Sequence, residues 1–277
     1  MERRAVTTSD GVRLSYLVGG TGQPIVMVPG WSQTATSFEN QFAALCSVSR
    51  VIALDMRGHG ESEKPDHGYR VQRLAKDLFD VIEALNLDQP DLLGHSMGAA
   101  VIWSYLSLFR AERPARKLIF VDEGAALMAR PDWNEGKRAQ AGCVFPSMDA
   151  LARAKQQILA ADAPETAAEI LRPMFSDAID ERTLMWVAGE NLKLPRHHAI
   201  RLLEDNVIQD WSELIATIEQ PVLAIGGGDS HIGTDSQRWI ADTVSNGRIE
   251  VIPGGRHFMF FEEFERFNAA ITSFLGE

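Results

Sequence analysis

The sequence predicts an α/β protein in which a mostly parallel sheet is flanked by helices and interrupted by a helical insert. Short continuous apolar runs, typical of buried strands, alternate with stretches whose apolar residues repeat at helical spacing. This alternation is typical of a parallel sheet with helices on both faces. In addition, a Gly-x-Ser-x-Gly motif at residues 94–98 lies between a strand-like apolar run and a stretch with helical spacing.

The predicted elements follow this alternation along the chain. Residues 3–18 are expected to form two short strands around an Asp10-Gly11 turn, which gives the sheet an antiparallel edge. Further strands are expected at residues 24–28, 51–54, 91–93, 117–121, 221–225 and 248–252. Helices are expected at residues 36–46, 71–86, 99–109 and 234–244, with a last helix that ends at Phe274.

Residues 125–214 differ from the rest because they contain no strand-like run. They are rich in Ala, Glu, Arg, Met and Trp and are broken by five prolines, which predicts four or five short helices. We therefore expect a core domain at 1–124 and 215–277, with a helical cap at 125–214 inserted after the sixth strand. Because sites in α/β proteins lie at the carboxyl ends of the strands, we expect this cap to cover the site.

The composition excludes several classes of function. The chain has 277 residues, of which 45% are hydrophobic and 23% charged, so it can bury a large core. Its net charge of -11 disfavours nucleic acids and anionic membranes as partners. Two cysteines, Cys46 and Cys143, provide neither a disulfide framework nor a metal site. With no signal or spanning segment visible, we expect a cytoplasmic protein, and the sequence leaves open whether it forms a homo-oligomer.

The motif at residues 94–98, Gly-His-Ser-Met-Gly, is typical of a nucleophile placed on a tight strand-to-helix turn. Such a turn strains the serine backbone, and glycines two positions away on either side remove side chains that would clash. The turn lifts the Ser96 hydroxyl clear of the sheet, at a helix N-terminus that favours a developing negative charge. Ser96 is therefore the candidate nucleophile.

A serine hydroxyl needs a base to take its proton, and histidine is the usual one. His257 lies in a glycine-containing loop directly after the last strand, which returns it to the edge of the sheet that carries Ser96. The other six histidines lie inside the motif, in other loops or in the insert: His59, His67, His95, His197, His198 and His231. We therefore expect His257 to be the base.

Two backbone N–H groups are needed to stabilise the oxyanion that forms when a serine attacks a carbonyl. One is expected from Met97, the residue that follows the nucleophile. The other is expected from Trp31, in the loop after the strand at 24–28, where Gly30 permits a sharp turn. The alternative is that this loop is only a turn closed by an aromatic side chain.

Four segments together resemble the α/β-hydrolase superfamily, and the resemblance covers the chain outside the insert. They are residues 29–31, 55–62, 94–98 and 257–259, the last with Glu262 and Phe267 nearby. They look most like the branch of esterases, lactonases and non-haem haloperoxidases. Many relatives carry His-Gly where this chain has Pro29-Gly30. Segment 55–62 is structural in this family, and we assign it no chemistry.

The resemblance also suggests where the acid of a catalytic triad would lie. The usual place follows the strand at 221–225, but Ser230 occupies that position and Asp229 lies one residue earlier. Some relatives place the acid at the end of the preceding core strand, where this chain has Asp122. We favour Asp122 over Asp229. Glu123 is a third candidate, weakened because neighbouring side chains diverge.

These residues predict a serine hydrolase that cleaves a carboxylic ester or lactone of a small, largely apolar substrate through an acyl-enzyme. The substrate is the expected partner, and no metal or organic cofactor is expected. Apolar side chains of the insert are mostly core, but some are expected to line the pocket. Alternatives are a perhydrolase or cofactor-free haloperoxidase with the same triad, or a small-molecule receptor built on a slow hydrolase. Ser96 argues against an epoxide hydrolase or a dehalogenase, which carry aspartate at this position in the family.

Overall fold

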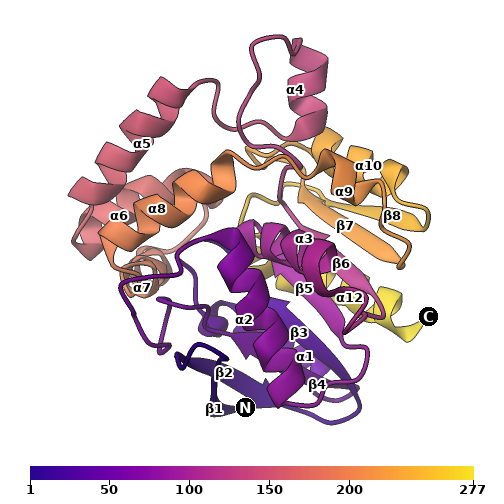
Figure 1. Ribbon diagram of the computed structural model, residues 1–277. Coiled ribbons are helices and arrows are strands. Elements are labelled where there is room, and N and C mark those ends of the chain that lie inside the picture. The colour runs from indigo at the N-terminus through magenta and orange to yellow at the C-terminus, as the bar shows by residue number, and fades with distance from the viewer.

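In the computed structural model, which describes residues 1–277, eight strands form one sheet (Figure 1). Their order across the sheet is β1-β2-β4-β3-β5-β6-β7-β8. β1 and β2 pair antiparallel, as do β2 and β4, and all other neighbours are parallel. The strands are β1 (Glu2–Thr7), β2 (Arg13–Gly19), β3 (Gln23–Val28), β4 (Ser49–Leu54), β5 (Asp91–His95), β6 (Leu118–Val121), β7 (Val222–Gly227) and β8 (Gly247–Ile252). The predicted fold class, a mostly parallel sheet with an antiparallel edge, is confirmed.

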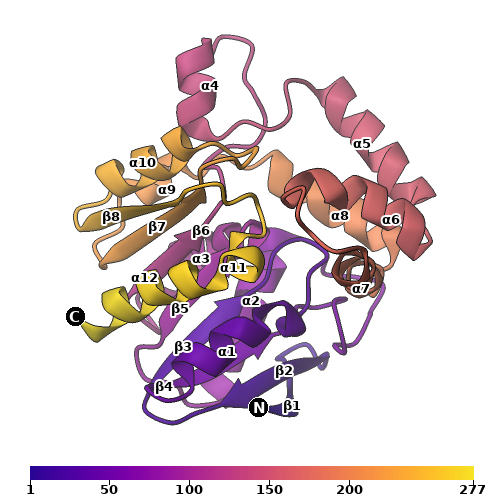
Figure 2. The same ribbon diagram turned by 180° about the vertical axis from the view of Figure 1, so that it is seen from behind.

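Helices cover both faces of this sheet. α2, α3 and α10 lie on one face, and α1, α11 and α12 lie on the other, as the two opposite views show (Figures 1 and 2). Their bounds are α1 (Glu39–Leu45), α2 (Val71–Ala84), α3 (Met97–Phe109), α10 (Thr234–Thr243), α11 (Met259–Glu262) and α12 (Phe264–Gly276). A 3-10 turn, η1 (Ala35–Phe38), precedes α1, and the single last helix expected from the sequence is broken at Glu263.

The two hydrophobic cores follow from the alternation of side chains along the central strands. In β3, Val26 and Val28 face the core under α2 and α3, whereas Ile25 and Met27 face the core under α1 and α12. Successive side chains of a strand point to opposite faces, so an uninterrupted apolar run fills both cores. This explains why the central strands could be recognised as continuous apolar segments.

A buried ion-pair cluster supports the loop after β4. The guanidinium of Arg57 is fully buried, and its Nη2 lies 2.8 Å from Asp77 and 2.9 Å from Asp10. Asp77 also accepts hydrogen bonds from Arg73. These contacts bind the loop to α2 and to the β1–β2 turn.

Between β6 and β7 the chain forms helices only, apart from one isolated bridge between Met128 and Phe145. The helices are α4 (Glu135–Ala141), α5 (Met148–Ala160), α6 (Pro164–Leu171), η2 (Arg172–Met174), α7 (Glu181–Asn191), α8 (Arg196–Val207) and α9 (Ser212–Ile215). This is more than the four or five expected, because elements of three or four residues are too short to show a helical repeat. α5 to α8 gather beyond the carboxyl end of the sheet, whereas α4 lies beside α10 (Figures 1 and 2). No helix has both the length and the apolar character that crossing a membrane requires.

Candidate active site

Ser96 occupies a strained turn between β5 and α3. Its φ of 50° and ψ of -130° lie in a region that side-chain-bearing residues rarely adopt. The turn requires glycine at positions 94 and 98. A Cβ on Gly94 would come within 2.5 Å of the Gly98 backbone, and a Cβ on Gly98 would come within 2.2 Å of the Val28 oxygen. The Ser96 N–H donates to the oxygen of Val121 at 2.8 Å, which ties the turn to β6.

His257 and Asp122 form a buried pair at the carboxyl edge of the sheet. His257 Nδ1 lies 2.7 Å from Asp122 Oδ2. Asp122 directly follows β6, and its φ of 51° is again positive for a residue with a side chain. Burial lowers the pKa of His257, which favours the neutral imidazole that can accept a proton.

The Asp122 carboxylate also accepts hydrogen bonds from the hydroxyl of Ser230 and, at 3.4 Å, from the N–H of Gly227. Burial raises the pKa of Asp122, and the hydrogen bond from Ser230 opposes that rise. The serine at the family's usual acid position therefore supports the carboxylate that the neighbouring strand provides. Asp229 is exposed instead, and its backbone N–H donates to the oxygen of Gly255.

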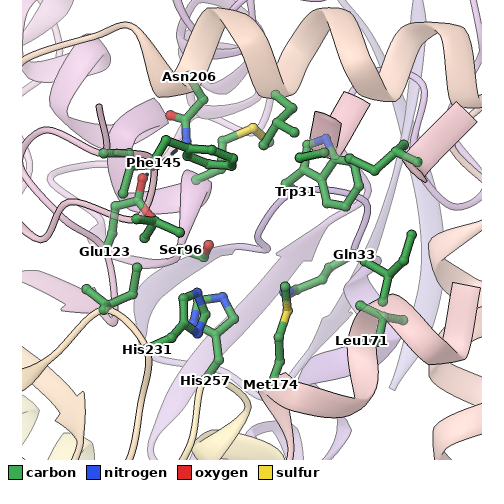
Figure 3. Close-up of a pocket in the computed structure, with 18 of the residues that line it drawn as sticks. Trp31, Gln33, Ser96, Glu123, Phe145, Leu171, Met174, Asn206, His231 and His257 are labelled. Atoms are coloured by element: carbon green, nitrogen blue, oxygen red, sulfur yellow. Dashed lines mark hydrogen bonds between the residues drawn. The ribbon is translucent and has the colours of Figure 1, made fainter. Parts of the chain in front are cut away.

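Ser96 and His257 line the same cavity, although no hydrogen bond joins their side chains in this structure (Figure 3). Such bonds are often loose before a substrate binds. The His257 loop is held by His95, whose Nε2 lies 2.8 Å from the His257 backbone oxygen. The motif histidine thus links the strand before Ser96 to the loop of His257, a structural role that the sequence did not indicate.

Two backbone N–H groups next to Ser96 have no protein acceptor. Met97 is the first residue of α3, so its N–H has no partner within the helix, and none is provided elsewhere. The Trp31 N–H is likewise unpaired, and a Cβ on the preceding Gly30 would lie 3.1 Å from Ser96 Cβ. The Trp31 indole is fixed by donating to the oxygen of Ala199 in α8 at 2.8 Å. The loop after β3 therefore lies directly against the serine.

The cavity has a volume of about 170 Å³, and both the core and the insert line it. Its walls are largely apolar, with side chains from α5, α6 and α8 facing Trp31 and Phe258 of the core. The polar groups that reach it are Gln33, Ser96, Glu123, Gln157, Asn206, His231 and His257. Of these, sequence reasoning had singled out only Ser96, Glu123 and His257 for the site, since nothing in the pattern around the others marks them.

The structure places Glu123 in the cavity rather than beside His257. Its side chain is 2% exposed, and its Oε1 accepts from Asn206 Nδ2 of α8 at 3.2 Å. Burial raises the pKa of Glu123 to about 8, and the hydrogen bond from Asn206 opposes the rise. The two neighbours after β6 therefore diverge, as expected: Asp122 points to the histidine and Glu123 to the cavity.

Known proteins resemble this chain over nearly its whole length. A family model described as alpha/beta hydrolase fold matches residues 23–264. A non-heme haloperoxidase from Rhodococcus erythropolis is 27% identical over 98% of each chain. The esterase EaEST from Exiguobacterium antarcticum superimposes with a TM-score of 0.85, at 25% identity over 99% of each chain. A bromoperoxidase from Bacillus anthracis has a TM-score of 0.90 over 100% of each chain and, at 22% identity, shows the fold alone.

The resemblance inferred from four short segments is thus confirmed across the sheet and the helices that flank it. The matched range includes β3 to β8, the turn at Ser96 and the loop of His257. The chain belongs to the α/β-hydrolase fold family.

Proposed function

We propose that this chain is a serine hydrolase that cleaves a carboxylic ester or lactone of a small, largely apolar substrate. The observation that carries the proposal is Ser96 on its strained turn, in one cavity with a histidine whose Nδ1 is held by Asp122 at 2.7 Å. The esterase with 25% identity supports the reaction class, and an enol-lactonase of the same fold from Burkholderia xenovorans makes lactones reasonable test substrates.

In the proposed reaction, His257 accepts the proton of Ser96 as the serine oxygen attacks the substrate carbonyl. Asp122 holds the imidazole in the tautomer whose Nε2 is free and stabilises the imidazolium. The N–H groups of Trp31 and Met97 donate to the oxyanion. His257 then gives its proton to the leaving alcohol, and a water molecule repeats the sequence on the acyl-enzyme. The acid, the base, the two donors and the nucleophile are all groups of this chain.

The helices between β6 and β7 act in this proposal as the cap that shapes the acyl and alcohol subsites. The support for this is that α5, α6 and α8 provide much of the apolar wall of a cavity of about 170 Å³. A volume of this size suits short acyl chains. We place the reaction in the cytoplasm, following the expectation from the sequence.

The proposal is tested by Ser96→Ala with p-nitrophenyl acetate. We expect kcat to fall by about 10⁶-fold, the order found when a serine nucleophile is removed from related chemistry. Ser104→Ala, a buried serine of α3 outside the cavity, is the matched control and should retain turnover. Wild-type rates in Ser96→Ala would contradict the proposal.

A second candidate is a perhydrolase or haloperoxidase reaction at the same groups, favoured by the haloperoxidase from Rhodococcus erythropolis that matches 98% of the chain. It would appear as bromination of a dye that depends on both hydrogen peroxide and a short carboxylic acid. A receptor built on a slow hydrolase would instead bind an ester tightly with turnover below about one per hour, far under the usual kcat of about 1–10³ per second.

A further inference from the structure

One wall of the cavity carries a polar pair that the proposed reaction does not use. Glu123 follows β6 and Asn206 belongs to α8, so the pair joins the core to the insert. Both side chains are buried, with exposures of 2% and 5%, and Asn206 Nδ2 donates to Glu123 Oε1 at 3.2 Å. Figure 3 shows both residues on the side of the cavity where Ser96 lies.

The pair is incomplete because the Asn206 carbonyl oxygen is buried and has no hydrogen-bond partner. Burying a polar atom without a partner costs about 1–3 kcal/mol, so native proteins rarely leave one unpaired. Asn206 lines the cavity, and one N–H of its amide nitrogen donates to Glu123. A ligand in the cavity that donates a hydrogen bond would satisfy this oxygen.

Glu123 lies between Asn206 and the nucleophile. The Ser96 hydroxyl is close enough to stabilise the charged form of Glu123, whereas burial and the nearby Asp122 favour the neutral acid. A neutral carboxyl group can donate as well as accept, and it stands next to an unfilled acceptor. The group that matches both is a hydroxyl, which donates to the amide oxygen and accepts from the acid. Because Glu123 is near Ser96, a hydroxyl bound there would lie close to the substrate carbonyl.

We propose that Glu123 and Asn206 form a specificity site for a neutral hydroxyl group on the acyl chain, near the ester carbonyl. This inference rests on the proposed esterase function and narrows it to hydroxy esters or hydroxy lactones. The remaining walls are apolar and suit the hydrocarbon part of such a substrate.

The test compares kcat/KM for ethyl 3-hydroxybutanoate and ethyl butanoate, which differ only in the hydroxyl. We expect the wild type to prefer the hydroxy ester by at least about 10-fold, because sites built to bind a hydroxyl reject analogues that lack it. Asn206→Leu, which has a similar shape and no acceptor, should reduce this ratio to near 1. Glu123→Gln keeps a neutral group that donates and accepts, and should keep the ratio within about threefold of the wild type.

Met174→Leu, a volume-conserving change on another part of the cavity wall, is the matched control. It should alter kcat/KM for both esters by the same factor and leave their ratio intact. A wild-type ratio near 1 would overturn the inference, as would Asn206→Leu lowering both rates equally. If Asn206→Leu does not fold, the wild-type ratio and Glu123→Gln still decide.

Binding to Ser96→Ala separates this inference from the proposed function. Saturation-transfer NMR should show stronger binding of ethyl 3-hydroxybutanoate than of ethyl butanoate, a difference that Asn206→Leu in the same background abolishes. This result would support the specificity site even if the wild type hydrolysed neither ester. Stronger binding of ethyl 3-aminobutanoate, whose ammonium group is charged, would overturn the choice of a neutral hydroxyl.

Discussion

Helix α3 in the core and helix α7 in the insert each contain a glycine, and the two glycines stand in very different surroundings. A Cβ on Gly98 would lie 2.2 Å from the Val28 oxygen, whereas a Cβ on Gly189 would have no atom within 4 Å. In the core, the helix lies so close to β3 that backbone meets backbone. At Gly189, by contrast, α7 has open space where a side chain could be added.

This difference in packing matches a division of tasks around the cavity. The core provides Ser96, Asp122 and His257, each at the carboxyl end of a strand or in the loop after it. The insert provides most of the apolar wall and the amide of Asn206. Close backbone contacts suit the proposed reacting groups, because small displacements of such groups are costly to catalysis. In the proposed function, the insert determines which substrates enter, because it provides most of the apolar wall.

After the loss of Ser96 itself, the largest effect is expected at the carboxylate that holds the proposed base. Asp122→Asn should lower kcat for an ester substrate by about 10⁴-fold, because an amide at this position favours the wrong tautomer of His257. Asp229→Asn is the matched control, since this residue is exposed and His257 pairs with Asp122 instead, and it should retain the wild-type rate. A collapse of activity in Asp229→Asn with Asp122→Asn unaffected would reverse the assignment.

The next effect is a change in the free energy of unfolding when alanine replaces each of the two glycines. Gly98→Ala should lower the free energy of unfolding by about 3 kcal/mol, because the added methyl group meets the backbone of β3. Gly189→Ala should raise it by about 0.5–1 kcal/mol, since alanine restricts the unfolded chain and has free space within α7. Urea denaturation of both variants measures the contrast, and equal destabilisation would mean that the insert is packed as closely as the core.

A pH-dependent effect is expected at Glu123, where core and insert meet. Its pKa is raised to about 8 in the folded protein, so between its ordinary value and about 8 the folded state binds more protons than the unfolded state. Stability contributed by this group is therefore lost as the pH rises, by at most about 1.4 kcal/mol per pH unit.

Glu123→Gln does not titrate and should lack this loss. The melting temperature of the variant minus that of the wild type should therefore increase from pH 5 to pH 8, as measured by circular dichroism. Glu165→Gln, on the exposed surface of α6, is the control and should show the same difference at both pH values. A constant difference for Glu123→Gln would show that the carboxyl group is already ionised at pH 5.

Much of the fold could be predicted because the core strands carry a pattern that is local in the sequence. Strand β3 was recognised from a run of apolar residues that must fill cores on both faces of the sheet. The turn at Ser96 was recognised from two glycines whose absence of side chains is a steric requirement. The insert was recognised only as helical, because short amphipathic helices carry no signal of the partners against which they pack.

The sequence by itself determined the fold class, the candidate nucleophile and the loop that carries His257. Each depends on a few residues adjacent in the chain. Only the tertiary structure decided that Asp122, and not Asp229, lies beside His257, because the direction of a side chain at a strand end depends on a backbone φ of 51° and on Ser230 from the loop after β7. It also decided that Asn206, 83 residues from Glu123, meets it inside the cavity. Such pairings arise when distant segments fold together, and no local pattern encodes them.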